Sequence, residues 1–244
     1  MPDTNTAAAF VKKLKTFQSA EELQKIQRYF KTGAADYGAG DEFMGVRMGQ
    51  VFALAKEFIT LPPDEIEKLL ESRIHEIRAG ACSIMDKQAR SKKMSADQRQ
   101  ALYELYLRRH DRINNWDLVD LAAPFVVGGY LFDKPRKVLY QLVRSKNVWE
   151  RRTAIVSTAY FIRQGDIDDT FAIAELLLND EHDLIHKAAG GWVREAGKQG
   201  RPRLLAFLDK YAATMPRMML RYAIEHLDAS QREHYLKRKQ AGDK

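Results

Sequence analysis

The sequence predicts an all-α fold, a HEAT-like helical-repeat solenoid in which helix pairs stack into an α-α superhelix. Three observations predict it. Alternating runs of Val, Ile and Thr and Asn-Gly hairpin turns, which signal strands, do not occur in the 244 residues. Apolar residues recur at helical spacing along most of the chain. After residue 64 the helical segments come in pairs, and their second members begin alike at intervals of roughly 30 to 45 residues, as in helical solenoids.

The first quarter of the chain precedes the pairs. Segments 7–16, 21–31 and 48–59 each carry one apolar stripe, and we expect amphipathic helices there. A glycine-containing stretch, 33–45, separates the second helix from the third and predicts a loop.

Five helix pairs follow, and each is too small to bury its apolar face alone, so neighbouring pairs must stack. The predicted pairs are 65–72 with 75–90, 96–108 with 116–132, 135–145 with 149–164, 170–178 with 184–199, and 203–215 with 217–227. We therefore expect one HEAT-like domain over 1–230 and a charged C-terminal tail over 231–244 that begins as a short helix. A generic helical bundle is the alternative.

One charged residue, followed by small and apolar ones, opens the second helix of each pair. Stacking places equivalent positions side by side, about 10 Å apart. The expected row contains four cations and one acid: Arg78, Asp120, Arg152, Lys187 and Arg221. A row of cations binds a phosphate backbone by charge, without reading the base sequence. The net charge of +7 is compatible with a polyanionic partner but is not specific for one.

Asp120 is the exception in this row. A carboxylate flanked by cations stays ionised, because opposite charges lower its pKa. It either pairs with Arg152 in a structural salt bridge or stabilises positive charge that develops on a sugar. Trp116 precedes Asp120 by four residues and projects from the same helix face. Its ring is either a core residue or an electron-rich surface for a cationic base or a sugar.

The stretch 116–120, Trp-Asp-Leu-Val-Asp, is similar to the Trp-Asp-x-Val-Asp motif of the bacterial DNA alkylation repair glycosylases of the AlkD family. In 147–154 a tryptophan precedes an arginine by three residues, as in that family, and 187–195 resembles its Lys-Ala-x-Gly-Trp-x-x-Arg-Glu segment. Segments 43–47 and 28–31 resemble its Gly-Val/Ile loop and its early Arg-Tyr-Met-Lys helix. The resemblance extends over about 21–227 and implies the same fold.

The resemblance also implies roles for single residues. Asp120 matches the catalytic aspartate, and Arg152 matches the arginine that contacts the DNA backbone near the lesion. Trp116 matches an aromatic that packs against the deoxyribose, and Tyr29 matches an aromatic near the lesion. The implied activity is excision of positively charged N3- and N7-alkylated purines from double-stranded DNA in base excision repair. The implied site contains catalytic Asp120 and the DNA-binding residues Trp116, Arg152, Trp192, Tyr29, Lys187, Arg221 and Arg78.

One position departs from the family pattern. The second site tryptophan of the family aligns with Gly191, whereas this chain has its tryptophan one residue later, at Trp192. One residue corresponds to about 100° around a helix. Either a local bulge at Gly190 and Gly191 restores the register, or the site lacks this aromatic wall.

Other site classes find little support in the sequence. The single cysteine, Cys82, excludes an intramolecular disulfide, which suits a reducing, cytoplasmic location. No apolar run is long enough to span a bilayer, and the six histidines lack metal-ligand spacing, so we expect no membrane, metal or cofactor. No protein partner is required for the implied reaction. Two alternatives remain: a non-catalytic HEAT-like module that binds DNA or RNA, and a protein-interaction solenoid whose basic face meets an acidic partner.

Overall fold

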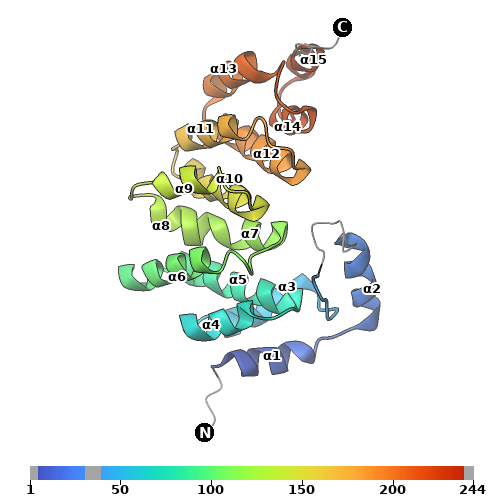
Figure 1. Cartoon of the computed structure of the whole chain (residues 1–244), viewed down its shortest axis with the longest axis vertical. Coiled ribbons are helices and arrows are strands. Elements are labelled where there is room, and N and C mark those ends of the chain that lie inside the picture. The colour runs from blue at the N-terminus through green and yellow to red at the C-terminus, as the bar shows by residue number, and fades with distance from the viewer. Residues whose placement is uncertain (1–4, 31–39, 239–244) are drawn as a thin grey trace. The chain divides into compact units, whose positions relative to one another are not determined.

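The computed structural model describes residues 5–30 and 40–238, and the described residues form helices and no strand (Figure 1). The all-α, helical-repeat fold that the sequence predicts is thereby confirmed. The chain divides into two compact units, Met1–Tyr130 and Leu131–Lys244. They are described in turn.

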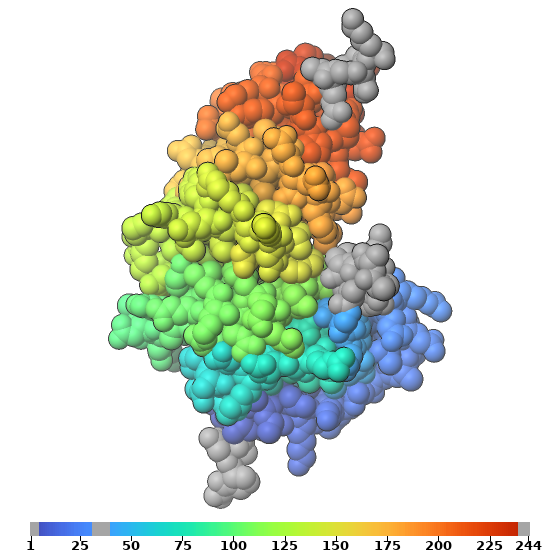
Figure 2. Space-filling view, viewed as in Figure 1, coloured from blue at the N-terminus to red at the C-terminus, as the bar shows by residue number. Residues whose placement is uncertain are grey.

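Helix pairs build unit 1 around one buried helix, α5. Its elements are α1 (Ala7–Lys15), α2 (Ala20–Tyr29), α3 (Met48–Glu57), α4 (Pro63–Leu70), α5 (His75–Arg90), α6 (Ala96–Arg108), α7 (Trp116–Ala123) and the π-helical turn η1 (Pro124–Gly128). Helix α5 packs against α3, α4, α6, α7 and η1, and most of its side chains are buried. In the space-filling view these helices form successive bands, from α1 in dark blue to α6 in green (Figure 2).

The predicted helix over 116–132 is interrupted. Pro124 lacks the N–H that an α-helix needs at that position. The N–H of Gly129 bonds to the carbonyl of Pro124, five residues back, which makes η1 a π-helical turn. A short helix, α8 (Gly129–Leu131), follows it. The sequence pattern therefore predicted the extent of the helical segment, but not the change of winding within it.

A buried carboxylate fixes the loop between α2 and α3. Glu76 of α5 is fully buried and accepts hydrogen bonds from the backbone N–H groups of Met44 (3.1 Å), Gly45 (2.9 Å) and Val46 (3.3 Å). Gly45 has a φ of +79°, and a Cβ there would lie 2.3 Å from the carbonyl oxygen of Ser19, so only glycine fits. The first part of the predicted 33–45 loop lies outside the described residues.

Unit 2 repeats the paired arrangement. Its elements are α9 (Lys137–Leu142), α10 (Val148–Arg163), α11 (Asp168–Leu176), α12 (Asp183–Gln199), α13 (Arg201–Tyr211), α14 (Arg217–Ala223) and α15 (Ala229–Lys237). The second helices of consecutive pairs pack against one another, α10 on α12 and α12 on α14. Helix α12 approaches α14 closely, because a Cβ on Gly190 would lie 2.3 Å from the carbonyl oxygen of Met219. This contact is the close approach that the small residues of the repeat predict.

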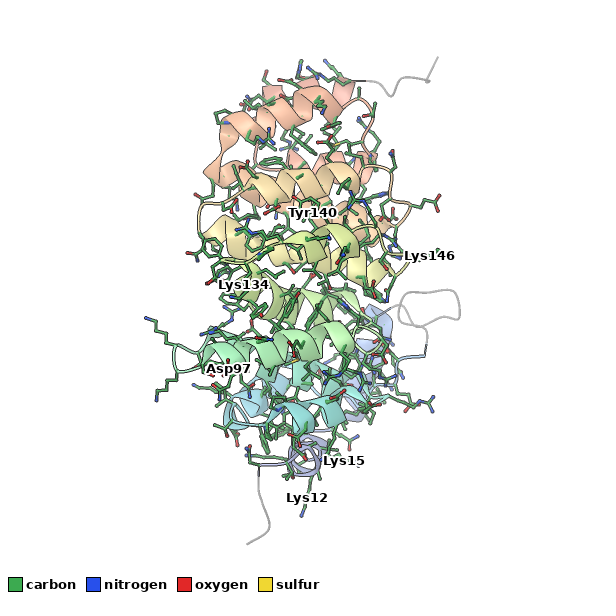
Figure 3. The ribbon with its side chains drawn as sticks, turned by 60° about the vertical axis from the view of Figure 1, so that its left-hand side comes forward. Lys12, Lys15, Asp97, Lys134, Tyr140 and Lys146 are labelled. Carbon is green, nitrogen blue, oxygen red and sulfur yellow. The ribbon has the colours of Figure 1, made fainter. Side chains whose placement is uncertain are left out.

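Helix α15 covers the first part of the predicted tail over 231–244, and residues 239–244 lie outside the described part of the chain. Among the described helices, none has the length and apolar character needed to cross a bilayer. Exposed lysines extend from both units, Lys12 and Lys15 from α1 and Lys146 from the turn before α10 (Figure 3).

Candidate active site

A groove of about 660 Å³ opens in unit 1 between α2, α3, α5 and α7. Most of its wall is apolar, and two carboxylates of α7 interrupt it. Tyr29 is 64% exposed and Phe52 is 38% exposed, which is unusual for large aromatic side chains and typical of ligand-binding surfaces. The lining residues are Lys25, Ile26, Tyr29, Phe30, Met48, Phe52, Ala79, Trp116, Asp117, Asp120 and Leu121.

The start of α7 determines which side chains line the groove. The Asn115 side chain caps the helix by accepting a hydrogen bond from the N–H of Trp116 (2.8 Å). Helical spacing then places Trp116 and Asp120 one turn apart on one face. Leu118 and Val119 are buried on the other side and hold the helix against the core. The predicted common face of Trp116 and Asp120 is thus present.

Three aromatic side chains form one wall of the groove. Trp116 stacks on Phe30 with ring centroids 6.0 Å apart and an interplanar angle of 23°. Tyr29 meets Trp116 edge to face, at 6.1 Å and 61°. Phe30 is buried, whereas Tyr29 and Trp116 keep exposed surface. The wall therefore offers electron-rich ring surface to a flat or cationic ligand.

The Asp120 side chain is half-exposed and lines the groove one turn after Trp116. Its neighbours in the wall are largely apolar. A carboxylate beside apolar groups is less screened by water than one on an open surface, so it attracts a nearby positive charge more strongly. The groove thus presents an acid to any cation that enters it.

A buried chain of charges lies beneath this acid. His75 is fully buried, and its imidazole bonds to two carboxylates, through Nε2 to Asp117 (2.7 Å) and through Nδ1 to Asp41 (3.2 Å). Arg78 forms an ion pair with the other oxygen of Asp41, and the Asn115 amide donates to Asp41 (3.0 Å).

The pKa of His75 follows from these contacts. Burial lowers it, but the hydrogen bonds and negative charges of Asp117 and Asp41 outweigh burial and raise the pKa of His75 to about 9. For Asp41, burial raises the pKa, and His75, Arg78 and Asn115 together lower it below the ordinary value of a carboxyl. His75 is therefore a cation at neutral pH, held between two carboxylates.

The groove brings together Asp120, Trp116 and Tyr29, all of which the sequence predicted for the site. Arg78 does not join them. It is only 2% exposed, and its guanidinium donates to the carbonyls of Ser72 (2.9 Å) and Arg73 (3.0 Å) besides pairing with Asp41. Arg78 therefore lies outside the groove, and its contact with DNA stays a prediction. A cation at that repeat position is a buried partner for Asp41.

The other predicted residues belong to unit 2. Arg152 of α10 is buried, and its Nη1 donates to the carbonyl of Leu184 (2.7 Å). Lys187 and Trp192 of α12 are half-buried, and Arg221 of α14 is exposed. Their contacts with DNA stay predictions.

The structure decides between the two alternatives for Gly190 and Gly191. Helix α12 is α-helical through both glycines, without a bulge. Trp192 therefore keeps the rotated position that its place in the sequence dictates. A Cβ on Gly191 would meet no atom within 4 Å, so this helix position is open. The alternative in which a bulge restores the family register is wrong.

Among the residues that the sequence did not predict for the site, Asp117, His75 and Phe30 contribute most to its geometry. Asp117 lies inside the motif that identified Trp116 and Asp120, and its position on the first turn of α7 was a usable signal. Phe30 follows Tyr29 in segment 28–31, which was likewise a usable signal, whereas His75 gave none, because its partners are distant in sequence. Within the described residues, no group of three or more His, Cys, Asp or Glu side chains has metal-binding geometry.

Comparison with known proteins agrees with this fold. A family model described as "DNA alkylation repair enzyme" matches residues 10–227. A solved structure from Enterococcus faecalis, described as a predicted DNA alkylation repair enzyme, is similar with a TM-score of 0.69 and 16% sequence identity. The similarity covers 87% of this chain and 97% of that one, and at this identity it shows the fold alone. Comparison with curated proteins gave no match.

Proposed function

The chain belongs to the family of DNA alkylation repair enzymes, and from this membership we propose that it is a monofunctional DNA glycosylase. Its substrates are positively charged N3- and N7-alkylated purines in double-stranded DNA. The observation that carries the proposal is the half-exposed Asp120 carboxylate beside Trp116 in a largely apolar groove.

The chemistry of the substrate matches such a site. An N3- or N7-alkylated purine carries a positive charge, so it leaves as a neutral base when the bond from C1′ to nitrogen breaks. The leaving group needs no acid. The barrier lies in the positive charge that develops on the sugar, and an anion close to C1′ lowers it. Water then adds to C1′ and loses a proton to solvent.

The groove supplies these requirements with few residues. Asp120 supplies the negative charge that stabilises the sugar cation and orients the attacking water. The rings of Trp116 and Tyr29 attract a cationic nucleoside through their faces, worth on the order of 0.5–2 kcal/mol. Outside the groove, the predicted DNA-binding residues of unit 2, Arg152, Lys187 and Arg221, hold the DNA backbone by charge.

A second function, DNA or RNA binding without excision, is favoured by one observation. The family's second site tryptophan is replaced by Gly191, and the straight α12 does not compensate for it. The loss of an aromatic side chain that the family uses at the lesion weakens the hold on the damaged nucleotide. Under this alternative the groove recognises the lesion and leaves the glycosidic bond intact.

The test is single-turnover release of free 7-methylguanine from methylated duplex DNA. Asp120→Asn should lower the rate at least about 100-fold, because it removes the stabilising charge while keeping the shape of the side chain. Its affinity for DNA should be equal or tighter, since one negative charge is lost. Asp97→Asn, at an exposed acid of α6, is the matched control and should leave both quantities unchanged. Full excision by Asp120→Asn would refute the proposal, and wild-type protein that binds DNA without releasing base would support the second function.

A further inference from the structure

Buried His75 of α5 contacts two side chains that line the groove, Asp117 and Phe30. Its Nε2 bonds to Asp117 of α7, three residues before Asp120. Its ring packs against Phe30 at 4.8 Å, and Phe30 is the ring on which Trp116 stacks. One buried side chain therefore contacts both the helix that carries Asp120 and the aromatic that supports Trp116.

We propose that protonated His75 is a positioning residue of this site. It holds the first turn of α7 and the stack of Phe30 and Trp116 in the arrangement that presents Trp116 and Asp120 to a bound nucleotide. The inference rests on the proposed glycosylase function for its consequence in catalysis. Its structural part depends only on the contacts of His75.

The need for a proton follows from the hydrogen-bond donors of imidazole. Asp41 and Asp117, when ionised, can only accept hydrogen bonds, and a neutral imidazole has one N–H for the two of them. Loss of the proton therefore breaks one of the two bonds to His75. Only the charged form donates a hydrogen bond to both carboxylates.

The bond to Asp117 is the one that the protein can least replace. Asp41 also receives Arg78 and Asn115. His75 bonds to Oδ2 of Asp117, and the Oδ1 atom is buried with no hydrogen-bond partner among the described residues. Asp117 thus depends on His75 for its donor. After deprotonation the single N–H either stays on Nε2, which turns the Nδ1 lone pair toward the Asp41 carboxylate, or leaves Asp117 without a donor, and either arrangement displaces the imidazole ring from its place between α7 and Phe30.

The charged groups that face His75 determine the pH range over which it keeps its proton. The loop before α3 contributes Asp41, and α7 contributes Asp117. On α5 itself, Arg78 acts through Asp41, whereas Glu76 is turned toward the backbone N–H groups of the loop. The remaining neighbours are the rings of Phe30 and Phe43. Two acids and one cation surround the imidazole, in accord with the pKa near 9.

The experiment uses the full-length protein labelled with 5-fluorotryptophan, whose ¹⁹F resonances report each tryptophan separately. Trp116→Phe assigns the resonance of Trp116. We expect that resonance to shift between pH 7 and 10 with a midpoint near 9, and His75→Gln to remove the shift. His226→Gln, at an exposed histidine of unit 2, is the matched control and should keep it.

Release of 7-methylguanine is measured over the same pH range, with blanks without protein. The rate should fall about 10- to 100-fold with the same midpoint, since a displacement of about 1 Å is enough for such a loss. His75→Gln should release 7-methylguanine slowly already at pH 7, and its rate should not decline further as the pH rises. Asp117→Asn keeps the side-chain shape and removes one of the two negative charges at His75, so the Trp116 midpoint should move below 9. This variant tests the proposal if His75→Gln does not fold.

The outcomes separate the two proposals. A Trp116 resonance that stays constant to pH 10, or keeps its midpoint in Asp117→Asn, would overturn the positioning role whatever the activity. Wild-type rates and an unchanged pH profile in His75→Gln would also overturn it. A Trp116 resonance that titrates with His75 in a protein that releases no base would support the positioning role and refute the glycosylase.

Discussion

The hydrogen-bonded group of Asp117, His75 and Asp41 should make unit 1 less stable at alkaline pH. The variant His75→Gln tests this directly. A histidine whose pKa is higher in the folded protein than in the unfolded chain takes up a proton on folding. The pKa of His75 is raised from 6.5 to about 9. Its contribution is fully present below pH 6.5 and is lost as the pH rises through about 9.

The size of the effect follows from the same two values. Each pKa unit corresponds to 1.36 kcal/mol, so the change from 6.5 to about 9 contributes about 3 kcal/mol to the free energy of unfolding at neutral pH. Full burial of His75 leaves little screening by solvent to reduce this figure. His75→Gln cannot carry the charge. The difference in stability between wild type and variant should therefore narrow by about 3 kcal/mol between pH 6.5 and 10.

Urea unfolding at several pH values measures this difference. The ¹⁹F resonance of 5-fluorotryptophan at Trp116 follows the unfolding of unit 1 separately from that of unit 2. His226→Gln is the control and should track the wild type at every pH. A wild-type stability that is flat between pH 6.5 and 10, or a constant gap between wild type and His75→Gln, would show that His75 is not charged in the folded protein.

Three further predictions concern parts of the chain outside the charge network. Gly190→Ala should destabilise unit 2, because the added Cβ meets a backbone carbonyl, whereas Gly191→Ala should stabilise unit 2 by about 1 kcal/mol, because alanine has the higher helix propensity. Urea unfolding measures both variants, and equal changes in stability would contradict the packing of α12 on α14. Glu76→Gln should lower the free energy of unfolding by about 1.5–3 kcal/mol and speed hydrogen exchange at the Gly45 amide. Unchanged exchange would mean that another group holds the loop. Arg221→Ala should reduce the salt dependence of DNA binding by about one phosphate contact, and an unchanged slope in a titration against salt would exclude it from the interface.

The helix pairs could be predicted from the sequence, because local apolar spacing and capping residues indicate each helix. The sequence was also sufficient for the pairing of Trp116 with Asp120, which are one helical turn apart. Local patterns could not predict the interior position of Arg78, since its partner Asp41 lies in a loop held by a different helix. The same limit applies to His75, whose two acids come from distant segments. Contacts within one turn of a helix are readable from sequence, and contacts that depend on how segments pack are not.

The charges beneath the groove indicate how the site can be specific for a cation without repelling DNA strongly. Asp41, His75, Asp117 and Arg78 together carry no net charge while His75 is protonated. Of the two carboxylates in the groove, Asp120 is then the one proposed to face a cationic base, and Asp117 serves to anchor α7. Above pH 9 the same four groups become negative by one charge.

If the site acted through net charge alone, excision of cationic bases would rise above pH 9, because a more negative groove stabilises a sugar cation better. If position governs the rate, excision falls, because the neutral imidazole keeps only one of its two carboxylate bonds and no longer holds α7 and Phe30 in place. The two explanations predict opposite changes in the excision rate above pH 9. Whether the rate rises or falls there therefore identifies whether His75 acts through charge or through position.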